Sequence, residues 1–310
     1  MTTLITGGNG FVGAEIARLL VEAGEGPIHV AQRSTDLGRL AGVADDVELH
    51  HLDLADGGEV ERVIDAIRPS RLFHFGAVLT GPGEQDPQAL LEANAVGFIR
   101  LIEAARLAGT DQLIFASSIG TYGRDLEPGP IHDRSLQRPN TAYGVTKVLG
   151  ENLGTYYRRR YGLDFRSLRY PAIVGPGVTT WSVAQYTSWM IEKPAMGEPF
   201  TVWRSPETVI ALLYYRDAAR AAVELAAAPA DAIRSVNYLV DGPRPTPTAG
   251  ELADAVRHHV PDARIDFEPD PSLPPAGEIR LDDRAARQEW GWAPAFDVDD
   301  MIADVIAAVG

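Results

Sequence analysis

The chain has 310 residues, a length that suits one large domain or two unequal ones. Its 28 basic and 43 acidic side chains leave a net charge of −15, and this balance argues against nucleic acid and anionic membrane surfaces as partners. Cysteine is absent, which excludes disulfides, thiolate metal sites and a cysteine nucleophile. The N-terminus carries no basic leader or cleavage pattern, and no apolar run is long enough to span a bilayer, so we expect a cytoplasmic protein.

Short apolar runs alternate with longer segments of helical period through the first half of the chain. The short runs predict strands over Thr2–Thr6, Ile28–Ala31, Val47–Leu52, Leu72–Phe75, Leu113–Ser117 and Phe165–Tyr170. The longer segments predict helices over Phe11–Ala23, Gly58–Ile67, Pro87–Leu107 and Ala142–Tyr161. This alternation is typical of a parallel sheet covered by helices on both faces. The helix from Pro87 has such a broad apolar face that we expect burial on two sides, which indicates a partner subunit.

Proline and glycine become frequent after Tyr170, and the order of elements changes. The later pattern predicts helices over Ser182–Glu192 and Tyr215–Ala228 and near Met301–Ala308, and strands over Val236–Val240 and Arg264–Phe267. No repeat or low-complexity linker separates this part from the first. We therefore predict one domain over residues 1–175 and a smaller α/β lobe over residues 176–310, with some later segments crossing back to the sheet.

A glycine-rich loop joins the first predicted strand to the first predicted helix. Gly7 allows the tight turn, Gly10 lets the backbone approach a pyrophosphate, and Gly13 lets the helix pack close to the strand. The amide dipoles at the helix N-terminus attract phosphate in spite of the acidic net charge. We therefore expect a doubly wound, Rossmann-type α/β domain that binds a nicotinamide dinucleotide. The predicted contacts of this loop are Gly7, Asn9, Gly10, Phe11, Val12 and Gly13.

The end of the second strand bears on the choice between NAD and NADP. An acidic side chain about 20 residues past the loop selects NAD by bonding the ribose 2′-hydroxyl. Gln32 stands there instead, followed by Arg33 and Ser34, which suit a 2′-phosphate and favour NADP. A solvated surface charge is the competing interpretation of Arg33. Asp53 and Leu54 follow the third strand, where a carboxylate can accept from the adenine amino group.

Three polar side chains have the residue types and order needed for proton transfer during hydride chemistry. Tyr143 and Lys147 are four residues apart on one predicted helix and so share a face. A neighbouring ammonium is expected to lower the phenol pKa from about 10, which would let Tyr143 act as a general base. Ser118 ends the fifth strand, where its hydroxyl can stabilise charge on a substrate oxygen, and Ser117 can assist it.

Together, these motifs resemble the extended short-chain dehydrogenases/reductases of the NAD-dependent epimerase/dehydratase family over nearly the whole chain. The segments that carry the resemblance are Thr6–Gly13, Asp53–Leu54, His74–Ala77, Asn94, Ser117–Gly123, Tyr143–Lys147 and Arg169–Pro171. The resemblance implies a seven-stranded sheet, a small substrate lobe and a homodimer formed through a four-helix bundle. It also implies cofactor contacts from Phe75, Gly76, Ala77, Asn94, Tyr143, Lys147, Tyr170 and Ile173. A buried structural amide is the competing interpretation of Asn94.

Details of the second lobe resemble one branch of the family. Arg166–Pro171, Val178–Thr180 and the tail from Leu281 to Trp292 are similar to the short-chain type of L-threonine 3-dehydrogenase. Two positions depart from that branch. Trp181-Ser182 replaces the Asp-Tyr that commonly follows the two threonines, and Gln32 replaces the acidic residue that selects NAD.

We therefore predict an NAD(P)-dependent oxidoreductase that interconverts an alcohol and a ketone on a small hydroxy or keto acid, or on an amino-acid-like substrate. The predicted substrate contacts are Ser117, Ser118, Thr179, Thr180 and Trp181. The first alternative is a sugar-nucleotide epimerase or dehydratase, which Ala172 disfavours because such enzymes usually carry an asparagine there. The second is a cofactor sensor without chemistry, which the complete Tyr/Lys pair disfavours. His50-His51 lacks further ligands at metal-binding spacing, so no metal is predicted.

Overall fold

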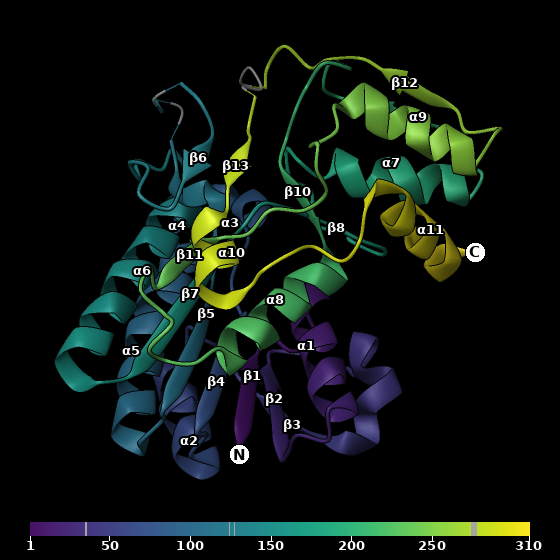
Figure 1. Cartoon of the computed structure of the whole chain (residues 1–310). Coiled ribbons are helices and arrows are strands. Elements are labelled where there is room, and N and C mark those ends of the chain that lie inside the picture. Colours follow the sequence, from purple (N-terminus) through teal and green to yellow (C-terminus); the bar gives the residue numbers. More distant parts are fainter. Residues whose placement is uncertain (35, 124, 127, 274–277) are drawn as a thin grey trace.

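The computed structural model describes residues 1–34, 36–123, 125–126, 128–273 and 278–310. Seven parallel strands form its main sheet in the order β11-β7-β5-β4-β1-β2-β3, so the chain begins in the middle and winds outward on both sides (Figure 1). The strands are β1 Thr3–Thr6, β2 Ile28–Gln32, β3 Val47–His51, β4 Arg71–His74, β5 Gln112–Ser118, β7 Asp164–Tyr170 and β11 Asn237–Leu239. The predicted Rossmann-type, seven-stranded sheet is confirmed.

Helices cover both faces of the sheet (Figure 1). Neighbouring residues on the central strand β1 point to opposite sides, so Ile5 packs in the core beneath the first helix layer and Leu4 in the core beneath the second. Burial on both faces explains why the central strands are continuous apolar runs. The first layer contains α1 Phe11–Glu22, the 3-10 segment η1 Gly38–Asp46 and α8 Tyr215–Ala227; the second contains α2 Gly57–Ile67, α5 Gly97–Ala108 and α6 Ala142–Tyr161.

Two glycines bring α6 unusually close to the sheet. A Cβ atom at Gly150 would overlap the ring of Phe115 on β5, and one at Gly154 would overlap the ring of Phe165 on β7. Because the two glycines are four residues apart, they share the face that meets the sheet. The close approach positions the N-terminal half of α6 against the carboxyl end of β5.

The segment predicted as one helix over Pro87–Leu107 is interrupted by a π-helical turn. It consists of α4 Pro87–Leu91, the π-helical η2 Glu92–Val96 and α5 Gly97–Ala108. Asn94 lies in this turn and is buried, and its side-chain amide both accepts from and donates to the backbone of Val78 at 2.8 Å. Such turns occur often at functional sites. A short helix that was not predicted, α3 Thr80–Gln85, precedes it.

The smaller lobe has its own apolar core. It contains α7 Tyr186–Ala195, α9 Ala249–His259 and α11 Val298–Val309 with two small parallel pairs, β8 Ala172–Val174 with β10 Leu212–Tyr214 and β9 Phe200–Val202 with β12 Ile265–Phe267. After residue 175 the chain crosses back to the main sheet through α8, β11 and α10 Arg284–Trp290, while β13 Leu281–Asp282 pairs with β6 Ile131–His132. Within the described residues, no helix has the length and apolar character to cross a membrane.

Candidate active site

The residues predicted to contact the cofactor come together at one edge of the main sheet. The glycine loop follows β1, Gln32 ends β2, Asp53 follows β3, Phe75 follows β4 and Tyr170 ends β7. The carboxyl ends of parallel strands lie at the same edge, which is where ligands bind in open α/β sheets. The hydroxyl of Tyr170 is already used, because it donates to the carbonyl of Ala218 on α8 at 2.8 Å. Ile173, on β8 just beyond, is half-buried.

The glycine loop has no room for side chains. Gly7 has a φ of 71°, and a Cβ atom on it would lie 2.6 Å from the backbone nitrogen of Gly76. Cβ atoms at Gly10 and Gly13 would lie 2.9 and 2.5 Å from the carbonyl oxygen of Gly7. Gly10 is the N-cap residue of α1, so no side chain caps the first amides of this helix. The first turn, which includes Phe11 and Val12, holds no acidic residue. The first-turn amides therefore fit the pyrophosphate of a dinucleotide.

Gln32 holds the glycine loop rather than projecting freely toward a ribose. Its side-chain oxygen accepts from the Asn9 amide at 2.6 Å, and its nitrogen donates to the carbonyls of Ser34 and Asp36. Arg33 and Ser34 have exposed side chains just beyond it. Asp53 accepts from the backbone of Ala55 at 2.9 Å, and the Leu54 side chain next to it is buried.

The structure brings the three predicted catalytic side chains together where β5 meets α6. Thr141 caps α6 by accepting from the amide of Gly144 at 3.0 Å, which sets Tyr143 in the first turn. The Ser118 hydroxyl lies close enough to the Tyr143 phenol to lower the phenol's pKa, and it accepts from the amide of Gly120 at 3.0 Å. Lys147 is almost fully buried, and its ammonium group lies 5.3 Å from the centroid of the Tyr143 ring. The site can therefore hold a substrate oxygen between a hydroxyl and a phenol.

The pKa shifts of the catalytic pair differ from the sequence-based prediction. Burial raises the pKa of Tyr143 to about 12, with the Ser118 hydroxyl acting in the opposite direction. The predicted lowering was wrong for this structure because Lys147 donates to the carbonyl of Ala116 at 2.7 Å, not to the phenol. Burial lowers the pKa of Lys147 to about 8. The phenol is therefore protonated at neutral pH when the site holds neither cofactor nor substrate.

A buried ion pair beneath the catalytic face was not predicted as part of the site. Glu151 lies one turn beyond Lys147 and accepts from two nitrogens of Arg169 on β7, at 2.8 and 2.6 Å. The hydroxyl of Ser117 also donates to Glu151, so in this structure it points into the ion pair. The signal was present in the sequence, since Tyr143, Lys147 and Glu151 follow the four-residue spacing of one helix face.

A buried histidine, His74, lies near enough to Lys147 to feel its charge. The ring of His74, at the end of β4, is buried and shares a 2.7 Å hydrogen bond with the hydroxyl of Thr6. It stacks against Phe98 and Phe115, with ring centroids 5.2 and 5.8 Å away. Burial, with a smaller contribution from the Lys147 charge, lowers its pKa to about 3. His74 therefore gives Lys147 a polar neighbour without a second positive charge.

The predicted substrate contacts of the second lobe lie on a segment that meets the first lobe at α3. A Cβ atom at Gly81 would lie 2.6 Å from the carbonyl oxygen of Trp181. Trp181 is 48% exposed and its ring approaches that of Trp203 at 6.3 Å between centroids. Thr179 is exposed and Thr180 half-buried. This segment faces the region just after Ala77, and within the described residues no hydrogen bond, ion pair or ring contact joins it to Ser118 or Tyr143.

Comparisons with known proteins agree with this geometry. The profile of the NAD dependent epimerase/dehydratase family matches residues 3–240. The mitochondrial L-threonine 3-dehydrogenase of Sus scrofa is 30% identical over 98% of this chain and 81% of its own length. A solved GalE-like L-threonine dehydrogenase from Cupriavidus necator, in its holo form, superimposes with a TM-score of 0.89 at 27% identity over the full length of both chains. UDP-glucose 4-epimerase from Thermus thermophilus, complexed with NAD, gives a TM-score of 0.85 at 26% identity, covering 100% of this chain and 99% of its own.

Proposed function

The chain belongs to the NAD-dependent epimerase/dehydratase family, and from that premise we propose that it oxidises the side-chain hydroxyl of L-threonine or a closely related β-hydroxy-α-amino acid. It is a nicotinamide-dependent oxidoreductase of the extended short-chain type. One observation carries the substrate class. The Sus scrofa threonine enzyme is 30% identical over 98% of the chain, and the solved threonine dehydrogenase superimposes with a TM-score of 0.89, against 0.85 for the epimerase that covers the same length. The second lobe supplies the side of the site that faces the substrate.

The catalytic roles follow from the side chains at the end of β5 and the start of α6. The Tyr143 phenol oxygen, as phenolate, takes the proton from the substrate hydroxyl, and the Ser118 hydroxyl donates to the same oxygen and orients it. Lys147 would hold the ribose hydroxyls of the cofactor. When bound, the nicotinamide cofactor would supply the acceptor for the hydride that leaves the substrate carbon. Since burial raises the pKa of Tyr143 to about 12, we expect oxidation to speed up as the pH rises toward alkaline values.

The second lobe would recognise the amino-acid part of the substrate. Thr179 and Thr180 offer hydroxyls to its polar groups, and Trp181 offers an apolar wall at the boundary with α3. Trp181-Ser182 replaces the Asp-Tyr expected in the threonine branch. We therefore expect this enzyme to accept a wider range of substrate carbon chains than the threonine enzymes it resembles.

The test is formation of NADH or NADPH by the purified chain, supplied with NAD and NADP in turn, on a panel of alcohols. L-Threonine and its β-hydroxy homologues should be turned over, whereas D-threonine and 3-hydroxybutyrate should react at least about tenfold more slowly in kcat/KM. UDP-glucose tests the alternative, because the 26% identical epimerase shares the fold. Epimerisation of UDP-glucose without net NADH, together with no turnover of any amino acid, would refute the proposal.

A preference for NADP over NAD is a finer proposal about the same site. No carboxylate stands at Gln32 to repel a 2′-phosphate, and the Arg33 guanidinium is exposed beside it. Replacement of Arg33 by alanine should lower kcat/KM for NADP by about tenfold and leave that for NAD nearly unchanged. A wild-type kcat/KM that strongly favours NAD would refute this preference.

A homodimer built from α4, α5 and α6 of two copies is also proposed. These neighbouring helices expose apolar side chains to a degree unusual for a solvent-facing surface: Leu91, Ile99, Leu107, Val145, Tyr156 and Tyr161. Sedimentation should show a dimer that Ile99→Asp converts to a monomer, while the matched change Met196→Asp on the smaller lobe has no effect. A monomeric wild-type chain would exclude the homodimer.

The cytoplasmic location stays a proposal, because the Sus scrofa relative is mitochondrial by name.

A further inference from the structure

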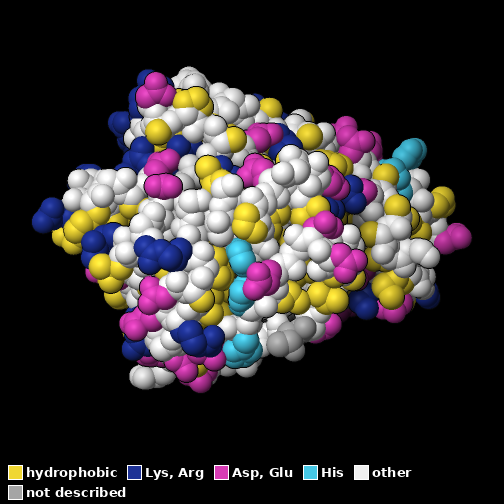
Figure 2. All heavy atoms as spheres, turned by 90° about the horizontal axis from the view of Figure 1, so that it is seen from below, with side chains coloured by type: hydrophobic (Ala, Val, Ile, Leu, Met, Phe, Trp, Pro, Cys, Tyr) yellow, Lys and Arg dark blue, Asp and Glu magenta, His cyan; other side chains and the backbone are white. Residues whose placement is uncertain are grey.

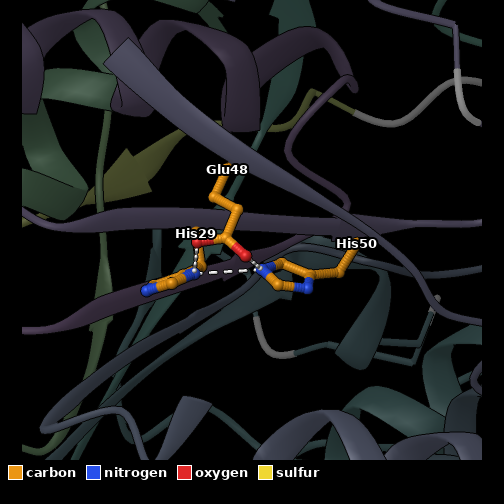
Figure 3. A group of neighbouring side chains, drawn as sticks. All are labelled: His29, Glu48 and His50. Carbon is orange, nitrogen blue, oxygen red and sulfur yellow. Dashed lines mark hydrogen bonds and ion pairs between the residues drawn. The ribbon is translucent and has the colours of Figure 1, made fainter. Parts of the chain in front are cut away.

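Three potential metal ligands lie on one face of the sheet at its β3 edge. His29 on β2 is paired in register with Glu48 on β3, and His50 follows Glu48 by two residues. Residues two apart on a strand share a face, so all three side chains project to the same side. That side is the one covered by α2 and α5, since Leu4, the register partner of His29 on β1, packs in the core beneath those helices. The residues converge although they come from separate strands (Figure 3).

The ligand atoms form a triangle of the size that a metal ion requires. The His29 Nδ1 and His50 Nε2 atoms are 3.0 Å apart. One carboxylate oxygen of Glu48 lies 3.4 Å from the His29 Nδ1 atom and the other lies 3.6 Å from the His50 Nε2 atom; one ligand atom from each of the three residues lies within 4.8 Å of the others. Tetrahedral zinc with bonds of about 2.0–2.1 Å separates its ligand atoms by about 3.3–3.4 Å. A shift of a few tenths of an ångström between the imidazoles is therefore enough to admit an ion.

Burial differs between the histidines and the glutamate in a way that suits a ligand set. The side chains of His29 and His50 are only 13% and 21% exposed, so the packing around the sheet restricts their rings. Glu48 is 67% exposed, which leaves the site open to water on its outer side. Seen from below, the molecular surface shows histidine side chains next to acidic ones (Figure 2).

We propose that His29, Glu48 and His50 bind one divalent first-row transition-metal ion, with zinc as the preferred occupant and water completing the coordination. Two imidazoles and a carboxylate are a ligand set that zinc uses. The ion would tie the edge strand β3 to β2, a position where an unpaired strand edge is otherwise exposed. The inference goes beyond the proposed oxidoreductase activity and does not depend on it. It also revises the sequence-based expectation, which considered His50-His51 without the two partners that the sheet supplies.

The test is zinc titration of the untagged, full-length protein after removal of metal by a chelator, using a chromophoric competitor. The wild type should bind one equivalent, and His50→Gln should lose at least about tenfold in affinity, since even partners of metal ligands are worth that much. His51→Gln is the matched control, because His51 is the next residue yet pairs with Glu59 at 3.1 Å. Glu48→Gln is a second test at an exposed position where folding is not in question. Cobalt should give the visible spectrum of a four- or five-coordinate ion in the wild type and in His51→Gln, but not in His50→Gln.

The outcomes separate this site from the catalytic one. Zinc should raise the Tm of the wild type and of His51→Gln by several degrees and leave that of His50→Gln unchanged. NADH formation should survive in His50→Gln, so failure of the activity and failure of the metal site are distinguishable. Binding of less than one equivalent by the wild type, or equal zinc affinity in the wild type and in both Glu48→Gln and His50→Gln, would overturn the proposal.

Discussion

Burial of His74 in a neutral form should make the protein less stable in mild acid. In the folded chain the pKa of His74 is lowered to about 3 by burial and by the nearby Lys147 charge, whereas the ordinary value is 6.5. The unfolded chain therefore binds a proton as the pH falls through 6.5, but the folded chain does not. The stabilising contribution is complete above pH 6.5 and is lost progressively toward pH 3. These two values give a loss of about 2 kcal/mol between pH 8 and pH 5, and about 3 kcal/mol by pH 4.

The variant His74→Asn isolates this effect. Its amide can still bond the Thr6 hydroxyl, which lies 2.7 Å from the His74 Nδ1 atom, but it cannot titrate. Loss of the stacking on Phe98 and Phe115 should lower the unfolding free energy by an amount that does not change with pH. Urea unfolding at one protein concentration, at pH 8, 6 and 5, measures both proteins. The wild type should lose about 2 kcal/mol more than the variant between pH 8 and pH 5.

A parallel decline of the two proteins would refute the reasoning. It would mean that His74 either takes up its proton in the folded chain near the ordinary pH or reaches water by local opening. A difference in unfolding free energy between the two proteins that appears only below pH 4 would point to the protonation of groups other than His74. The comparison is independent of substrate and cofactor, so it tests the electrostatics of the site before any activity is known.

Three further predictions concern the catalytic helix. Tyr143→Phe should lower kcat by about 10²–10⁴-fold while fluorescence titration shows unchanged NAD binding; near-normal turnover would exclude the phenol as the proton-transfer group. Glu151→Gln should lower the free energy of unfolding by about 3–5 kcal/mol, because it leaves Arg169 charged and buried, and a loss below about 1 kcal/mol in urea unfolding would contradict this. Gly150→Ala should cost about 1–3 kcal/mol in the same assay because the new methyl group overlaps Phe115; an unchanged midpoint would show that α6 can move away from the sheet.

Local patterns predicted the parts of the fold that depend on near neighbours in the chain. The apolar runs of β1, β2, β4, β5 and β7 were found because both faces of an interior parallel strand are buried. In the second lobe the helix α9 was missed, although Thr248 and Glu251 form a capping box that is visible in the sequence. The interruption of the helix around Asn94 had no such signal, since it depends on a hydrogen bond to Val78, 16 residues away.

The same distinction between local sequence and tertiary packing applies to the candidate site. The sequence by itself determined the glycine loop and the residue types of the catalytic set, because a turn without side chains and a four-residue helical spacing are local properties. Only the tertiary structure decided the protonation of Tyr143, the pairing of Glu151 with Arg169, and the meeting of His29 with Glu48 and His50. Each of these depends on burial or on contact between separate strands and helices. The position of a side chain relative to water and to distant charges is a property of the packed molecule, and no local spacing records it.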